Sequence, residues 1–261
     1  MLIGAGLGHW STVELLYVVF AIAVGGFVRG YSGFGFALAA APMLSVVLDP
    51  VDAIPLVLAF EVILTLAFLP RLVSLVDWRA LRWLVLGAVM GTPFGIYFIA
   101  AVPPEPMRFI LGLILLVSVL VTWRRPSSQR WRPTSPATAG VGAISGVLSG
   151  GTAMSGPPIV LYFLAVPVSP AVGRASMMMF FLCSATIALL FGVSAGVYPT
   201  KTFVLAGLSL PALLAGAILG AKLFAYSEPT TYRQVALSML GTIAVFALGS
   251  ATFHALGMPR M

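Results

Sequence analysis

The chain has 261 residues, of which 60% are hydrophobic and only 8% are charged, and its mean hydropathy is +1.08. A soluble domain carries about 25% charged residues, so this composition excludes a soluble protein. At about 20 residues for each spanning helix, the length predicts an all-α polytopic membrane protein. Roughly eight to ten membrane segments fit, with no room for a separate soluble domain.

The net charge of +7 comes from clustered arginines. Two clusters lie within residues 71–82 and 124–132, and such clusters mark cytoplasmic loops. The partners expected from this pattern are a lipid bilayer and a small anionic substrate, and no nucleic acid. We expect a multi-pass protein of the inner (plasma) membrane. The single cysteine, Cys183, excludes an intrachain disulfide, and we expect no metal site and no cofactor.

The first membrane segment runs into a glycine-rich stretch. Val13–Val28 predicts a helix, and Gly25–Leu44, which we call the first signature, reads GGFVRGYSGFGFALAAAPML. Each glycine weakens a helix by up to about 1 kcal/mol, and Arg29 costs at least about 2.5 kcal/mol near the bilayer centre. The apolar residues 13–48 would form about 54 Å of helix, too long for a membrane core of about 30 Å. We therefore predict a broken helix or half-helix that lines a polar cavity.

Three further membrane helices are predicted in the first half. They are Ala53–Leu69, which contains Glu61, then Leu81–Ala101 and Arg108–Trp123. In the second of these, Gly87, Gly91 and Gly95 recur every four residues, a pattern typical of close packing between membrane helices. The first transporter repeat is assigned to residues 1–123, and residues 124–136 form a basic, proline-rich cytoplasmic linker.

The same plan returns in residues 137–261, the second repeat. Ser145–Leu164, the second signature, reads SGVLSGGTAMSGPPIVLYFL and matches the first at a shift of 120 residues. Farther on, a shift of 125 residues places Gly91 on Gly216. Two related halves with interrupted apolar segments point to the binding site of a transporter. The alternative is that the small residues only allow close helix packing.

The halves are predicted to be inverted repeats, because the N-terminal tail has no Lys or Arg. The alternative is parallel halves, which would follow if each signature crossed the membrane once. After the second signature, a turn is expected at Val166–Arg174. The remaining predicted spans are Ala175–Gly192, Phe203–Phe224 and Val235–His254.

The two signatures resemble the signature segments of the sulfite exporter TauE/SafE family of membrane transporters. The resemblance covers nearly the whole chain, including a basic loop with the sequence VDWR, Val76–Arg79. It implies a polytopic protein that moves small sulfur oxyanions, such as sulfite, sulfonates or sulfoacetate, or related carboxylates. The chain departs from the family at Ala153–Ser155, where many relatives carry more glycine, and this leaves the substrate open.

The candidate substrate site lies at the turns of the two signatures. Helix N-termini there offer free N–H groups to an anion, and glycine lets a ligand approach the backbone. The hydroxyls of Ser32, Thr152 and Ser155 either donate to the ligand or cap a helix. The proposed substrate-binding residues at these turns are Ser32, Gly33, Phe34, Gly35, Thr152, Ser155, Gly156 and Pro157.

Three charged residues complete the predicted site. Arg29 either holds the anion through two N–H donors or extends to the membrane interface, and Arg174 has the same two interpretations. Glu61 is a candidate for proton coupling because a desolvated carboxyl can titrate near neutral pH. The alternatives for Glu61 are a structural pair, with Arg29 or another buried donor, and a place in the cavity wall.

The function predicted from these features is secondary active transport, in the export direction, driven by protons or membrane potential. No nucleotide-binding loop of the GxxxxGK[ST] type is present, so we expect no ATP hydrolysis by this chain. The alternatives are an intramembrane enzyme and an accessory membrane protein. An enzyme is not expected, because Cys183 has no histidine near it in the sequence and the two histidines lie near the chain ends.

Overall fold

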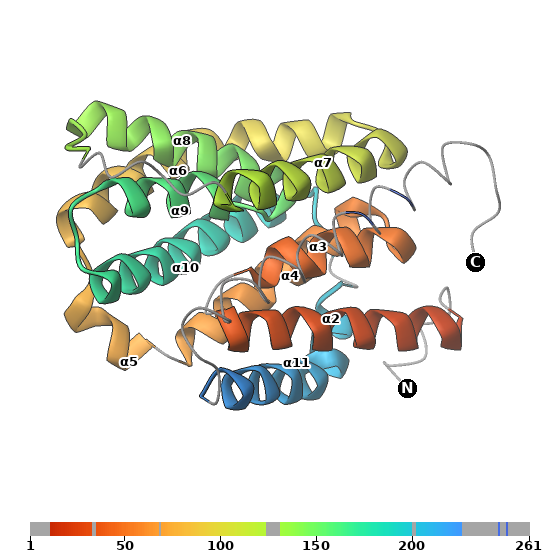
Figure 1. The fold of residues 1–261 in the computed structure, drawn as a ribbon. Coiled ribbons are helices and arrows are strands. Elements are labelled where there is room, and N and C mark those ends of the chain that lie inside the picture. Colours follow the sequence, from red (N-terminus) through yellow and green to blue (C-terminus); the bar gives the residue numbers. More distant parts are fainter. Residues whose placement is uncertain are drawn as a thin grey trace. The chain divides into compact units, whose positions relative to one another are not determined.

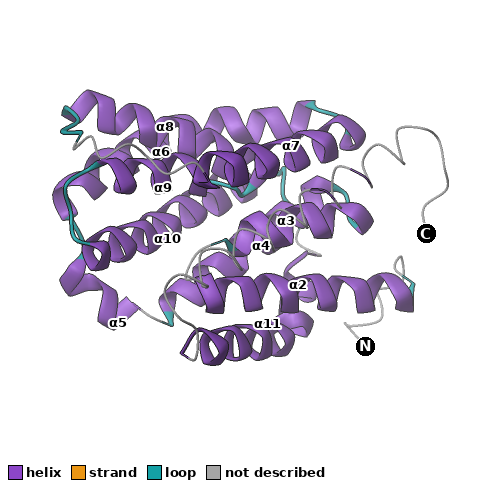
Figure 2. Cartoon of the chain, in the orientation of Figure 1, coloured by secondary structure: helices purple, strands orange, loops and turns teal. Residues whose placement is uncertain are grey.

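The computed structural model describes residues 11–32, 35–67, 69–123, 131–199 and 202–225, together with residues 245 and 249. In this part of the chain every regular element is a helix, as Figures 1 and 2 show. The predicted all-α fold is therefore confirmed. The predicted last span, Val235–His254, lies outside the described residues apart from positions 245 and 249.

The helices follow the order of the predicted segments. They are α2 (Thr12–Ser32), α3 (Phe36–Val47), α4 (Pro50–Leu66), the short α5 (Leu69–Leu72) and η1 (Val73–Leu75), α6 (Trp78–Ala101), α7 (Pro104–Trp123), α8 (Ser135–Thr152), α9 (Gly156–Ala165), α10 (Pro170–Ser194) and α11 (Thr202–Ala225). Four apolar stretches, in α2, α6, α10 and α11, are long and apolar enough to cross a membrane, judged within the described ranges. α3 and α9 are shorter apolar helices.

Both signatures break as predicted. The first signature ends α2 at Ser32 and begins α3 at Phe36, and the second ends α8 at Thr152 and begins α9 at Gly156. α3 has 12 residues and α9 has 10, which gives lengths of about 18 Å and 15 Å. Each therefore spans roughly half of a 30 Å membrane core, as expected of a half-helix.

The internal repeat is visible in the helix boundaries. Ser32, Phe36 and Pro50 end or begin helices in the first half, and the residues 120 positions later, Thr152, Gly156 and Pro170, do so in the second. The two halves are thus structurally related. Their inversion stays a prediction.

The described chain divides into two compact units. Unit 1 comprises residues 1–57, 103–116 and 198–261, and unit 2 comprises residues 58–102 and 117–197. Each unit contains elements from both sequence halves. The first signature lies in unit 1 and the second in unit 2.

In unit 1, α2 packs against α11 through glycine on both helices (Figure 1). A Cβ atom added at Gly26 would lie 2.5 Å from the Leu213 carbonyl oxygen, and one at Gly30 would collide with the Ala217 backbone. Gly216 and Gly220 of α11 meet α2 in the same way, at Ala23 and Phe27. Since the residue numbers of both helices rise together along the contact, α2 and α11 run parallel.

In unit 2, α6 and α8 repeat this arrangement. A Cβ atom at Gly146 would lie 2.5 Å from the Ala88 carbonyl oxygen, and one at Gly91 would collide with the Ala143 backbone. Ala88 and Leu213 are 125 residues apart, and Gly26 and Gly146 are 120 apart, so the two contacts are equivalent. The packing role that the sequence left as an alternative therefore applies to these glycines, including those inside the signatures.

Some boundaries differ from the prediction. α8 begins at Ser135, because Pro136 fits the first helical turn, where its missing N–H is not needed. α10 begins at Pro170, with the Ser169 hydroxyl accepting a hydrogen bond from the Val172 N–H (3.3 Å). The turn expected at Val166–Arg174 is therefore shorter, and Arg174 lies in a helix.

The close α6–α8 contact predicts opposite effects at two neighbouring glycines of α8. A Cβ atom at Gly142 would collide with the Leu84 backbone, whereas one at Gly140 would meet no atom within 4 Å. Gly142→Ala should lower the free energy of unfolding by about 1–3 kcal/mol through overpacking. Gly140→Ala should raise it by up to about 1 kcal/mol through helix propensity. Thermal unfolding of the purified variants measures both, and equal effects at the two positions would contradict the contact.

Candidate functional site

The break in the second signature is built from local hydrogen bonds. Ala153 ends α8 in the left-handed region, with φ 60°, and its N–H donates to the Ser149 carbonyl (3.0 Å). The Thr152 hydroxyl donates to the Leu148 carbonyl (2.7 Å) and accepts from the Met154 N–H (3.3 Å). Thr152 therefore stabilises the end of α8, and its contact with a ligand stays a prediction.

The start of α9 is different. Ser155 precedes the helix, but its side chain makes no capping hydrogen bond to the α9 backbone. The capping role considered for Ser155 is therefore wrong, and its hydroxyl is directed elsewhere. Pro157 and Pro158 lie in the first turn and have no N–H group. At this helix start the backbone donors nearest the break are those of Ser155 and Gly156.

Three serine hydroxyls form a line across unit 2, which we call the hydroxyl line. The hydroxyl oxygens of Ser149 and Ser184 are 3.2 Å apart, and the Ser184 hydroxyl donates to the Ser155 hydroxyl oxygen (3.3 Å). Ser149 and Ser184 are fully buried, and Ser155 is 6% exposed. The line joins α8, the start of α9 and α10 at the break itself.

Sequence reasoning missed Ser149 and Ser184. Ser184 lies in the middle of an apolar helix, and its partners are 35 and 29 residues away in the chain. The available signal was the spacing of Ser145 and Ser149, because residues four apart lie on one helix face. Ser145 is also fully buried in α8.

Gly156 has free space beside it. A Cβ atom added there would meet only the Phe181 ring, at 3.9 Å, which is an ordinary van der Waals distance. This position differs from the helix-packing glycines, whose added Cβ atoms would collide with backbone. A Cβ atom at residue 156 therefore fits without a collision. The rest of a longer side chain would extend from the break between α8 and α9.

The first signature is described in part. Gly35 precedes α3 with φ 90°, a conformation that favours glycine. Gly33 and Phe34 lie outside the described residues, as does the side chain of Ser32. Arg29 lies in the last turn of α2 and is 4% exposed. Its side chain is thus covered by protein, which does not fit extension to a membrane interface.

The other charged candidates are placed apart. Arg174 is exposed near the start of α10 and lies ten residues, or about 15 Å along the helix, from Ser184. Glu61 is 7% exposed in α4 and interacts with other groups of the protein. Glu61 belongs to unit 2 and Arg29 to unit 1, so their pairing stays a prediction.

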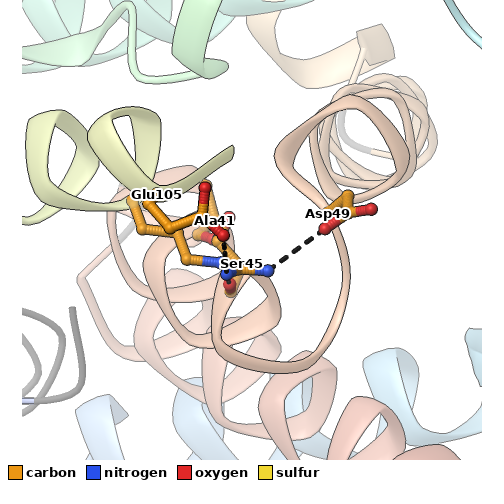
Figure 3. Close-up of polar contacts among 5 residues, drawn as sticks. Ala41, Ser45, Asp49 and Glu105 are labelled. Carbon is orange, nitrogen blue, oxygen red and sulfur yellow. Dashed lines mark hydrogen bonds and ion pairs between the residues drawn. The ribbon is translucent and has the colours of Figure 1, made fainter. Parts of the chain in front are cut away.

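A buried arginine in unit 1 serves the half-helix α3. Arg108 of α7, which is 6% exposed, donates from Nε to the Ser45 carbonyl (2.6 Å) and from Nη2 to Asp49 Oδ1 (3.2 Å) (Figure 3). Ser45 is among the last four residues of α3, whose carbonyls lack intrahelical partners. The equivalent carbonyl in unit 2, that of Ala165, accepts from the Trp131 N–H (2.9 Å). Arg108 therefore caps the C-terminal end of α3 and links it to α7 by a hydrogen bond.

The chemistry available at the second signature is that of neutral donors. Serine hydroxyls and backbone N–H groups bind oxygen-rich anions by hydrogen bonds. Within the described ranges, no three His, Cys, Asp or Glu side chains come together as metal ligands. The arrangement suits reversible binding of an oxyanion.

Comparisons with known proteins identify relatives of this chain. The family model described as "Sulfite exporter TauE/SafE" matches residues 17–247. The chain is also 24% identical over 233 residues to a protein of Cupriavidus necator named "Probable sulfite/organosulfonate exporter TauE", and the match covers 87% of this chain and 91% of that protein. No solved structure shows a significant match.

Ala153 is the described non-glycine residue with positive φ, and this predicts a stabilising substitution. Alanine in the left-handed region costs about 1–2 kcal/mol, and glycine removes that cost while adding entropy to the unfolded chain. Ala153→Gly should therefore raise the free energy of unfolding by about 0.5–1 kcal/mol, measured by thermal unfolding. As a control, Ala185→Gly in the middle of α10 should lower it by about 1 kcal/mol. A less stable Ala153→Gly protein would contradict the assigned backbone conformation.

Proposed function

Because the chain belongs to the sulfite exporter TauE/SafE family, we propose that it exports small sulfur oxyanions, namely sulfite or organosulfonates, across the inner (plasma) membrane. The family and the apolar helices identify a membrane transporter. The proposed substrates are those in the name of the relative from Cupriavidus necator. A transporter is also consistent with the expectation that the chain is not an enzyme.

The observation that carries this proposal is the buried break between α8 and α9. A helix interrupted at membrane depth is tolerated where it lines a polar site, and transporters place substrates at such breaks. Here the break combines the N–H groups of Ser155 and Gly156 with the hydroxyl line. These groups match the oxygens of a sulfite or sulfonate.

We assign the equivalent role in the first half to the first signature. Its turn comprises Ser32, Gly33, Phe34 and Gly35, and Arg29 lies one turn before it. In this proposal Arg29 contributes a fixed positive charge, and Gly35 begins a half-helix whose dipole favours an anion. Thr152, Pro157 and Arg174 are secondary members of the site: Thr152 and Pro157 shape the break, and Arg174 attracts the anion from near the start of α10.

The proposed driving force is a proton gradient or the membrane potential, with Glu61 as the coupling group. A carboxyl in an apolar membrane helix is a functional candidate, and Glu61 is 7% exposed. An anion that carries negative charge out of a cell moves with the usual membrane potential. Protons that enter the cell in exchange for the anion would add to that force.

A bulky residue at Gly156 should abolish transport without unfolding the protein. Gly156→Leu has room near the backbone because only the Phe181 ring is close, but its side chain fills the space in front of the donors. Counterflow of radiolabelled sulfite and of sulfoacetate in proteoliposomes should fall to background. The wild-type protein should show counterflow of at least one of the two anions.

Two controls separate site blockage from loss of packing. Gly140→Leu adds the same bulk to open space and should transport normally. Gly91→Leu, which collides with the Ala143 backbone, should instead lower stability. A folded Gly156→Leu protein with native anion affinity would place the site elsewhere, and a wild-type protein that moves neither anion would refute the proposed function.

Glu61→Gln tests the coupling role. The substitution removes the titrating group while keeping a similar shape, so pH-driven accumulation should disappear while anion exchange at equal pH continues. Uptake under an imposed pH gradient, compared with counterflow in the same vesicles, measures the two activities. If accumulation by the variant still follows the pH gradient, Glu61 does not carry the proton.

A further inference from the structure

We propose that the transported oxyanion is held by Ser145 of α8, which donates to it directly, and by Ser184 of α10 and Ser149 of α8, which orient the Ser155 hydroxyl toward it. This inference rests on the proposed function, because it names the side chains that hold the substrate in unit 2. Ser145, Ser149 and Ser184 lie outside the signature turn predicted from the sequence. Ser149 and Ser184 form hydrogen bonds with other side chains, and the Ser145 hydroxyl has no partner among the described residues.

Five of the buried or partly buried hydroxyls on the described helices donate to the carbonyl four residues earlier. Thr152 donates to Leu148 and Thr186 to Leu182, each at 2.7 Å. The same bond is made by Ser45 to Ala41, Thr92 to Ala88 and Thr138 to Thr134. A hydroxyl bonded in this way has no proton left for a ligand.

The hydroxyl line behaves differently. Ser149, Ser184 and Ser155 carry one donor proton each, and the contacts along the line, between Ser149 and Ser184 and from Ser184 to Ser155, use two of these protons. Because Ser184 donates to Ser155, Ser149 donates to Ser184, and the Ser155 proton is left without an acceptor among the described residues. A molecule that accepts hydrogen bonds and has none to donate would satisfy it.

Ser145 supplies a second, independent indication. Its residue is fully buried, and its hydroxyl has no hydrogen-bond partner among the described residues. A buried polar group left unsatisfied costs about 1–3 kcal/mol, so such a group calls for an explanation. Ser145 lies one helical turn from Ser149 on the same face of α8, which directs its hydroxyl toward the same region as the hydroxyl line.

The surplus of donors favours an oxyanion over a metal cation or water. Sulfite and sulfonate groups expose several acceptor oxygens that can take protons from more than one serine. Neutral donors also hold an anion less tightly than a buried ion pair would, and a transporter must release its substrate. The hydroxyls are covered by protein in this structure, as expected when a transporter encloses its site between its two open states.

The decisive variant is Ser145→Ala, because it should make the empty protein more stable and at the same time weaken its affinity for the anion. Removing an unsatisfied buried hydroxyl should raise the melting temperature of the empty protein. If the hydroxyl donates to the anion, the same change should raise the Kd for sulfite or sulfoacetate about ten- to a hundredfold, the value of one hydrogen bond to a charged group. Purified full-length protein, with thermal unfolding and calorimetric titration of each anion, gives both readings.

Ser184→Ala should likewise raise the Kd about ten- to a hundredfold. Ser184→Thr, which keeps a hydroxyl, should restore affinity to near the wild-type value. Thr186→Val is the matched control, because it lies on the same helix and its hydroxyl donates to a backbone carbonyl. Its Kd should not change. If Ser149 and Ser184 act through one hydrogen-bonded line, the double alanine variant should lose less affinity than the two single losses combined.

Three results would overturn the inference. One is native Kd in both Ser145→Ala and Ser184→Ala while the wild-type protein binds the anion. Another is stabilisation of the protein by Na⁺ that disappears in Ser184→Ala, with no anion dependence, because that would make the serines cation ligands. A third is a wild-type protein that binds neither anion, which would refute the proposed function itself and the inference with it.

Discussion

Contact between helix backbones is the constraint on which both units depend. Lipid tails are as apolar as the helix surfaces, so helices in a membrane associate through close packing and polar contacts. In α2–α11 and α6–α8 the glycines allow one backbone to touch the other, with Cα–H groups close to carbonyl oxygens. Each pair has glycine on both helices, and the two pairs are equivalent through the internal repeat. The half-helices and the serines of α10 are placed against these pairs.

In the proposed function, the polar groups of the protein divide between structure and substrate. Arg108 satisfies the carbonyl of Ser45 and meets Asp49, so a buried cation serves the end of α3. The second signature has neutral hydroxyls instead, and part of their hydrogen-bonding capacity is not used among the residues that the structure describes. This contrast explains why a buried charge is not by itself the mark of the substrate site. The more informative feature is a buried donor that has no acceptor.

The breaks in the helices could be predicted from the sequence, and the partners of the glycines could not. A break depends on local residues, since Gly35, Pro157 and Pro158 act through their own backbone chemistry. The contact of Gly26 with Leu213 joins positions far apart in the chain, and a glycine has no side chain to indicate its partner. Ser184 was missed for a related reason, because its role depends on helices that precede it by about 30 residues. The positive φ of Ala153 could not be predicted either, because alanine does not favour that conformation.

Each unit takes helices from both halves of the chain, and this sets the order in which the units can form during synthesis. α6 is already made when α8 leaves the ribosome, so the pair that supports unit 2 can form as soon as α8 enters the membrane. α2 must wait for α11, which begins about 190 residues later. At typical synthesis rates of about 5–20 residues per second, that delay is roughly 10–40 s. During this time the glycine surface of α2 is open to other helices, and a nascent chain stalled before α11 would have one finished unit and one without its main support.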